Sequence, residues 1–209
     1  MAEATRTYDL SRTAVLLVDP YNDFLSDGGK LWPLLQPVAT AAGLLDNLRT
    51  AITAARNSGV PVVFVPHRRW EETNYVGWDH PNPNQVGVNR QQIFARGSWG
   101  GEFHPDFQPR AGEVVVTEHW AQSGFANTDL NAQLTQRGIT HVVLVGVVAN
   151  TCVESTGRFA MELGYHVTLV RDATAAFSVE AMHAAHELNG PTYAHAIVTT
   201  TELVEILAH

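Results

Sequence analysis

Short, strongly hydrophobic runs alternate along the chain with longer segments whose apolar residues recur every three or four positions. Short runs of this kind are typical of buried parallel strands, and the longer amphipathic segments are typical of the helices that connect them. The strands predicted from the short runs cover residues 14–18, 62–65, 114–117, 142–147, 166–170 and 197–199. The alternation therefore predicts one α/β domain with about six parallel strands.

The predicted helices lie between these strands. Apolar residues at helical spacing predict one helix from about Val38 to Asn57, and further helices over 128–137, 151–163, 179–188 and after 199. Between 66 and 112 the pattern dissolves into aromatic, Asn, Pro and Gly residues, which predicts a long connection without secondary structure. We expect one domain over 1–209, with an N-terminal arm at 1–11 and a pocket-forming connection at 66–112.

Charge and composition narrow the choice of partners. The 209 residues are 45% hydrophobic and carry a net charge of -8, from 13 Lys and Arg against 21 Asp and Glu. This balance predicts a folded globule that does not bind nucleic acid. No apolar run approaches the length of a membrane span, and the first twelve residues lack the apolar core of a signal peptide. We therefore expect no membrane association and a cytoplasmic location.

Three chemically versatile residues follow predicted strands. Asp19 ends the first strand, His119 follows the third, and Cys152, the only cysteine, follows the fourth. Each has an ordinary structural interpretation when it is considered alone: a strand-end cap, a surface histidine and a buried cysteine. However, ligands of parallel sheets bind beyond the carboxyl ends of the strands, and this rule brings all three residues to one edge. Cys152 also starts a helix, whose N-terminus favours a thiolate.

Four segments resemble the isochorismatase-like cysteine hydrolase superfamily, from about Thr13 to Val204. They are LLVDPYNDF, SGFANTDL, GVVANTCVESTGRFAMELGY and VTLVRDATAAF, in this order and spacing. The resemblance implies a three-layer α/β domain, in which a six-stranded parallel sheet is flanked by helices. It also implies a catalytic triad of Asp, Lys and Cys, in which Asp19 and Cys152 occupy the matching positions. His119 stands where the lysine is usual, and Lys30, the only lysine, lies in the loop after the first strand.

The proposed catalytic residues are therefore Asp19, His119 and Cys152. A histidine can deprotonate the thiol, pair with the thiolate and later protonate a leaving amine, so we expect a His119 cation to lower the pKa of Cys152. Whether Asp19 or His119 is the general base stays open at this point. Glu118 precedes His119 on an extended segment and should point the other way.

The resemblance also implies an oxyanion hole. It places a cis peptide bond between Val147 and Val148, and it assigns the N–H groups of Val148 and Cys152 as the two donors. Such donors stabilise the negative charge that develops on a carbonyl oxygen.

Aromatic residues supply the candidates for substrate binding. They are Phe24, Trp70, Tyr75, Trp78 and Trp120. The alternative is that these rings anchor the long connection or a subunit contact. Arg68 and Arg69 either bind a substrate carboxylate or form a solvated pair.

No metal and no cofactor are expected. Nicotinamidases of the superfamily carry an Asp-x-His metal motif after the second strand, and the segment PHRRWEETNYVGWDH lacks it. The candidate ligands in and after this segment would be His67, His80 and His104. His183 and His186 are three positions apart on a predicted helix, but without a third ligand we interpret them as surface or interface residues.

The sequence thus predicts a cysteine hydrolase that cleaves a carbon–nitrogen, amide-type bond of a small molecule through a Cys152 acyl-enzyme. One alternative is hydrolysis of the isochorismate vinyl ether, a reaction of the same superfamily that needs no cysteine nucleophile. A second alternative is a non-catalytic relative that binds a metabolite. The resemblance and the aromatic loop further predict a homo-oligomer, a dimer or a tetramer.

Overall fold

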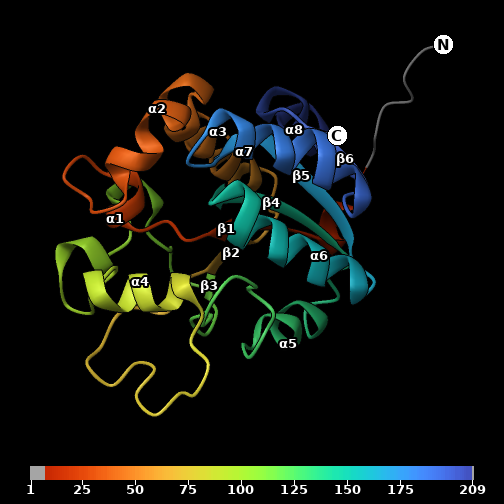
Figure 1. Ribbon diagram of the computed structural model, residues 1–209. Helices are drawn as coiled ribbons and strands as arrows, with labels where there is room; N and C mark the ends of the chain where they lie inside the picture. The colour runs from red at the N-terminus through yellow and green to blue at the C-terminus, as the bar shows by residue number, and fades with distance from the viewer. Residues whose placement is uncertain (1–7, 209) are drawn as a thin grey trace.

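A six-stranded parallel sheet runs through the centre of the protein (Figure 1), seen in a computed structural model that describes residues 8–208. The spatial order of the strands is β3-β2-β1-β4-β5-β6, and every neighbouring pair is parallel. The strands are β1 (Thr13–Val18), β2 (Val62–Val65), β3 (Val114–Val115), β4 (His141–Val147), β5 (His166–Ala175) and β6 (Ala196–Val198). The predicted α/β fold is therefore confirmed.

Helices cover both faces of this sheet, which gives three layers (Figure 1). Alternate residues of β1 face opposite sides: Val15 and Leu17 join one hydrophobic core, and Leu16 joins the other. The first core contains residues of α1 (Asn22–Leu25), α2 (Trp32–Ala42), α3 (Leu44–Asn57) and α8 (Thr200–Leu207). The second contains residues of α5 (Leu130–Thr135) and α6 (Glu154–Glu162).

The strand order reverses between β1 and β4, so this pair forms the switch point of the sheet. Val18, the last residue of β1, is in register with Val65 of β2 on one side and Gly146 of β4 on the other. The carboxyl ends of the three strands therefore lie at one level. Ligands of open parallel sheets bind at such a point, because the connections leave it in opposite directions.

Three predicted elements have different lengths in the structure. The single helix expected up to Asn57 is two helices, because the chain turns at Gly43 with φ +66°. The third strand is only two residues long, although His119 makes an isolated parallel bridge to His67 further on. The fifth strand extends to Ala175, beyond a register shift against β4.

The long connection at 66–112 contains helical structure, so the prediction that it has none is wrong. It includes α4 (Pro83–Gln91), and two short 3-10 turns at Trp99–Gly101 and Pro105–Phe107. Asn82 and Gln85 form a capping box at the start of α4, and the Lys30 ammonium donates to the carbonyls of Gln91 and Gln92 at its end. These caps stabilise a helix that shows no apolar periodicity.

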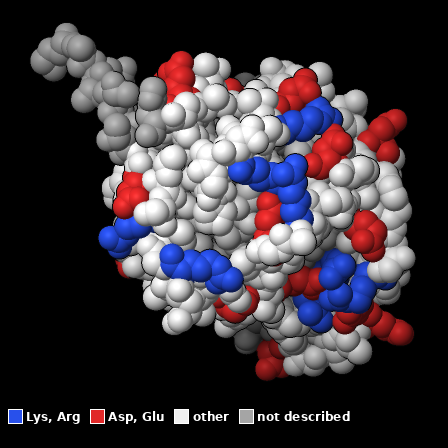
Figure 2. Space-filling view, turned by 180° about the vertical axis from the view of Figure 1, so that it is seen from behind, with Lys and Arg blue, Asp and Glu red and all other residues white. Residues whose placement is uncertain are grey.

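The remaining predictions about organisation concern the chain ends and the surface. Of the expected N-terminal arm, residues 1–7 lie outside the described part, and Leu10–Arg12 forms a 3-10 turn. Among the described helices, none combines the length and the apolar character that a membrane crossing requires. On the face shown in Figure 2, acidic and basic side chains are interspersed rather than gathered by sign.

Candidate active site

Asp19 lies directly after β1 in a conformation that few residues adopt. Its φ is +53°, and its N–H donates to the carbonyl of Val65 at 3.1 Å. Gly146 stands across from the end of β1, where an added Cβ would lie 2.2 Å from the Val18 oxygen. Only glycine therefore allows β4 to approach the strand end that holds Asp19. The Asp19 side chain is fully buried.

His119 is held by the extended segment that continues from β3. Its N–H donates to the carbonyl of Pro66 at 2.9 Å, and its own carbonyl accepts the N–H of Arg68 at 2.8 Å. These two bonds fix the backbone against the segment that follows β2. The imidazole is fully buried, and its Nε2 lies 3.0 Å from Asp19 Oδ1. The two side chains are thus hydrogen-bonded across 100 residues of sequence.

Cys152 sits in a π-helical turn, Ala149–Val153, that joins β4 to α6. The N–H groups of Thr151 and Val153, on either side of it, both donate to the carbonyl of Val148, at 3.1 and 3.2 Å. The thiol is free and nearly buried, with 6% of the residue exposed. Its sulfur lies 3.9 Å from both the Thr151 hydroxyl and the Ala121 carbonyl oxygen.

The structure brings the three predicted catalytic residues together. One ligand-type atom from each of Asp19, His119 and Cys152 lies within 4.8 Å of the other two. Two atoms of this cluster, Asp19 Oδ2 and His119 Nδ1, are buried and have no hydrogen-bond partner within residues 8–208. Because a buried polar atom without a partner destabilises a protein, such atoms are typical of sites that bind or react.

The electrostatics of the thiol differ from our expectation. Burial, and then the negative charge of Asp19, raise the pKa of the Cys152 thiol well above its usual range. The prediction that this pKa is lowered is therefore wrong. The helix N-terminus and His119 do not lower the thiol pKa enough to offset the increase caused by burial and by the nearby carboxylate. The resting enzyme holds a neutral thiol beside a potential base.

The backbone before Cys152 has the geometry that the resemblance implies. The peptide bond between Val147 and Val148 is cis. Both valines are buried, and Val148 immediately precedes the π-helical turn that carries Cys152.

The basic and acidic residues around His119 form a separate network. Glu118 is 2.6 Å from Arg69, 3.1 Å from Arg96 and 3.7 Å from Arg68. Glu118 thus engages arginines, in agreement with the prediction that it points away from His119. Arg68 and Arg69 are ion-paired rather than simply solvated, and Arg68 also stacks 4.6 Å over the Trp120 ring. The contribution of Arg96 was not foreseen, because it lies 22 residues before Glu118 in a segment without a recognisable pattern.

Three of the five aromatic candidates form one cluster. The ring centroids of Tyr75, Trp78 and Trp120 are 5.1 to 5.9 Å apart, and the Tyr75 hydroxyl donates to the Trp120 carbonyl. Phe24 packs separately, against Phe94 at 5.0 Å and Phe177 at 6.4 Å. Trp70 belongs to neither group of rings. Its backbone is paired with Phe94 and Arg96.

His67 is a neighbour of the site that sequence reasoning considered only as a metal ligand. Its ring is buried, with its centroid 5.0 Å from that of His119. Burial and the proximity of His119 lower the pKa of His67, so the ring is neutral at pH 7. The Nδ1 of His67 is hydrogen-bonded to the Arg68 carbonyl. The backbone carbonyl of His67 accepts a hydrogen bond from the Tyr21 hydroxyl. Each of the two histidines stands two residues after a predicted strand, 62–65 or 114–117, and this was the available signal.

A cavity of about 530 Å³ opens on the α6 side of Cys152. Ala121 belongs to its wall, and the carbonyl oxygen of this residue lies 3.9 Å from the Cys152 sulfur. Most of the other lining side chains are polar and come from the long connection, from the segment after His119 and from α6: Asn82, Gln122, Ser123, Ser155, Arg158 and Phe159.

Known proteins share both the sequence pattern and the fold. A family model described as the isochorismatase domain matches residues 13–202. The ureidoacrylate amidohydrolase RutB of Yersinia enterocolitica is 30% identical over 181 residues, which cover 80% of this chain and 76% of that protein.

Two solved structures extend the comparison. A cysteine hydrolase from Pseudomonas syringae pv. phaseolicola 1448A has a TM-score of 0.77 and 25% identity, with 100% of this chain and 99% of that chain covered. The N-carbamoylsarcosine amidase from Thermoplasma acidophilum has a TM-score of 0.64 and 27% identity, with 90% of this chain and 96% of that chain covered.

Proposed function

The chain belongs to the isochorismatase family of hydrolases, and from this premise we propose that it hydrolyses a carbon–nitrogen bond of a small amide or ureide through a covalent intermediate on Cys152. The observation that carries the proposal is the convergence of Asp19, His119 and Cys152 within 4.8 Å at the switch point of the sheet. Two relatives, named for a ureidoacrylate and an N-carbamoyl amino acid, support the choice of bond.

In the first half of the reaction, the Cys152 sulfur attacks the substrate carbonyl carbon while Asp19 takes the thiol proton. We assign Asp19 as the base because its charge is the largest influence on the thiol pKa after burial. His119 donates from Nε2 to Asp19 Oδ1 and so holds the carboxylate in position. The proton then passes from Asp19 to the leaving nitrogen. The carbon–nitrogen bond breaks, and an acyl-enzyme and ammonia or an amine are formed.

The oxyanion of each tetrahedral intermediate needs hydrogen-bond donors. We assign this role to the N–H groups of Val148 and Cys152, and the cis bond before Val148 and the turn that carries Cys152 support the assignment. In the second half of the reaction, Asp19 takes a proton from water as the water oxygen attacks the acyl carbon. The carbon–sulfur bond breaks, the sulfur is reprotonated and the acid is released.

The neutral resting thiol fits a substrate without a strong negative charge. The cavity beside Cys152 presents amide and hydroxyl groups from Asn82, Gln122, Ser123 and Ser155, which can pair with an amide or ureide group. The segment 66–112 supplies Asn82, and it supplies Tyr75 and Trp78, which pack against Trp120. We therefore propose that this connection forms one wall of the pocket. Phe24 and Trp70 would contact a substrate from outside the cluster.

Hydrolysis of the isochorismate vinyl ether is the second candidate function. The family name favours it, since the matched model is described as the isochorismatase domain. That reaction does not require a thiol, whereas the thiol here adjoins a carboxylate with an unpaired oxygen, within the described residues. The thiol therefore favours amide chemistry.

A substrate panel distinguishes the two. The panel contains ureides, N-carbamoyl amino acids, simple amides and isochorismate, with ammonia and pyruvate as the detected products. We expect ammonia from at least one ureide or amide, and no turnover by the Cys152→Ala variant. Pyruvate from isochorismate with an active Cys152→Ala variant would replace the proposal by vinyl ether hydrolysis. Stoichiometric binding without any product would identify a metabolite-binding relative.

We also propose a cytoplasmic location and a homo-oligomer, a dimer or a tetramer. A catalytic cysteine must stay reduced, which the cytoplasm ensures. Exposed apolar side chains support self-association, among them Phe159 (46% exposed) and Leu163 (47% exposed), at α6 and directly after it. Sedimentation velocity at micromolar concentration tests the assembly, and a fully active monomer would contradict it.

A further inference from the structure

The three residues of the site are also three metal ligands of different chemistry. Asp19 offers a carboxylate oxygen, His119 an imidazole nitrogen and Cys152 a sulfur, and all three atoms lie within 4.8 Å of one another. Catalytic zinc sites bind the ion with three protein ligands and keep a fourth position for water. Within the described chain, Asp19 Oδ2 and His119 Nδ1 also lack a hydrogen-bond partner. The cluster thus has unused bonding capacity in a buried place.

The distances are close to those that a zinc ion imposes. Two nitrogen or oxygen ligands of a tetrahedral zinc ion lie about 3.3 Å apart, given bonds of about 2.0 to 2.1 Å. His119 Nε2 and Asp19 Oδ1 lie 3.0 Å apart, so a small widening of this pair admits an ion. Sulfur and nitrogen ligands of one zinc ion lie about 3.5 Å apart. A side-chain movement of about 1 Å therefore brings Cys152 into range.

The charge of the site depends on the residue at position 119. A lysine there would add a cation without a free electron pair at neutral pH, which opposes metal binding. With His119, the carboxylate of Asp19 and the thiolate of Cys152 together balance the two charges of a zinc ion. This balance of charge favours binding, because an uncompensated charge is costly where solvent is excluded. The positive charges of Arg68 and Arg69 are paired with Glu118.

From this arrangement we propose that Asp19, His119 and Cys152 bind Zn²⁺ and that the bound ion reversibly blocks the nucleophile. On binding, the sulfur–proton bond breaks, a sulfur–zinc bond forms and that proton leaves to water. The His119 proton moves from Nε2 to Nδ1, which has no other partner among the described residues, so that the Nε2 lone pair binds the ion. No oxidation state changes. The metal-bound sulfur no longer attacks a carbonyl. The inhibition rests on the proposed function, whereas the binding does not.

Cobalt is the probe for binding, because Co²⁺ occupies zinc sites and gives an intense near-ultraviolet band when a thiolate ligates it. We titrate Co²⁺ into the full-length wild-type protein and into Cys152→Ala, His119→Lys and His183→Ala. The His183→Ala variant is the matched control, since this histidine is exposed and is not one of the three proposed ligands. The wild type and the control should give the thiolate band with one ion per chain. Cys152→Ala should lose the band, and His119→Lys should bind Co²⁺ at least about 100-fold more weakly.

A second measurement needs no variant. Zn²⁺ should slow the alkylation of Cys152 in the wild-type protein, and a chelator should restore the rate. Absence of the cobalt band in the wild type, or an unchanged band in His119→Lys, overturns the proposed site. Amide hydrolysis that is insensitive to Zn²⁺ overturns the inhibition but leaves the proposed function. A cobalt band without any amide hydrolysis keeps the metal site and refutes the function instead.

Discussion

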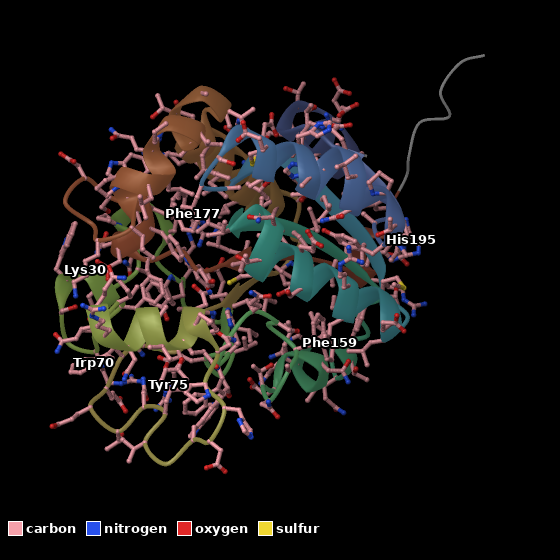
Figure 3. All side chains as sticks on the ribbon, in the orientation of Figure 1. Lys30, Trp70, Tyr75, Phe159, Phe177 and His195 are labelled. Atoms are coloured by element: carbon pink, nitrogen blue, oxygen red, sulfur yellow. The ribbon has the colours of Figure 1, made fainter. Side chains whose placement is uncertain are left out.

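Histidines gather at both ends of the same sheet, in opposite environments. At the carboxyl edge, His119 is fully buried between a carboxylate and a thiol. At the amino edge, His141, His166 and His195 stack on one another, with ring centroids 4.8 and 4.6 Å apart. Figure 3 shows His195 at the opposite end of the molecule from Trp70 and Lys30. Parallel pairing aligns strand ends at either edge, so both clusters follow from one topology.

The difference between them lies in burial and in the chemistry of the neighbours. At the amino edge, His195 is exposed, and its Nδ1 accepts the N–H of Val167. His141 pairs with the Thr140 hydroxyl and is only half-buried. At the carboxyl edge, polar atoms are buried and unpaired within the described chain, beside a nucleophile and a base. A histidine therefore indicates a reactive site here only where it is buried beside a carboxylate and a thiol, and not where it stacks on other histidines near the solvent.

The largest effect is expected from removing the sulfur at the carboxyl edge. Cys152→Ala should reduce turnover to below a few per cent of wild type, because no other thiol exists in the chain. Substrate binding and the melting temperature should change little, since alanine fits the buried turn. Steady-state ammonia release and thermal melts check this. More than a few per cent of residual activity in a clean preparation would remove the covalent mechanism.

His119→Ala should lower kcat/KM by at least the roughly 100-fold typical of a group that assists proton transfer. The variant loses the hydrogen bond that orients Asp19 and leaves the carboxylate unpaired. His119→Lys restores a donor and should recover part of the activity. The pH profiles of kcat/KM for the three proteins are the measurement. A wild-type rate for His119→Ala would show that Asp19 acts without this partner.

Asp19→Asn should change turnover and thiol reactivity in opposite directions. Loss of the carboxylate removes the base, so kcat falls, and it removes a negative charge that raises the pKa of Cys152. The pKa of the thiol then falls and more thiolate exists at neutral pH, so iodoacetamide should alkylate the variant faster than wild type. The exposed Asp46→Asn is the control for a remote charge. Slower alkylation of Asp19→Asn would mean that the carboxylate does not oppose ionisation of the thiol.

The sequence predicted the sheet and the three site residues because both depend on local pattern and on one topological rule. Apolar runs marked the strands, and the strand ends placed Asp19, His119 and Cys152. The pattern missed α4, whose stability comes from the Asn82 capping box and from Lys30 rather than from an apolar face. It also missed the direction of the Cys152 pKa shift, because burial of the thiol depends on side chains that pack from distant segments.

The smallest effect is expected at the amino edge. Burial lowers the pKa of His141, so the unfolded chain binds more protons than the folded protein as the pH falls below about 6.5. The stabilisation that depends on a neutral His141 is therefore complete above that pH and is lost as the pH falls. His141→Gln should make the free energy of unfolding less dependent on pH between about 7 and 5, and leave kcat/KM unchanged. Urea unfolding at several pH values checks this, and a loss of activity would contradict the contrast between the two edges.

A covalent intermediate on Cys152 can be detected by trapping. The enzyme is mixed with the ammonia-releasing substrate in the presence and absence of hydroxylamine, quenched in acid and analysed by intact mass and peptide mapping. We expect a substrate-derived acyl mass on the Cys152 peptide, or conversion of the product from acid to hydroxamate with undiminished ammonia release. The covalent mechanism would be contradicted if the enzyme turns over while Cys152 stays unmodified, no hydroxamate forms, and ammonia is not released before the acid.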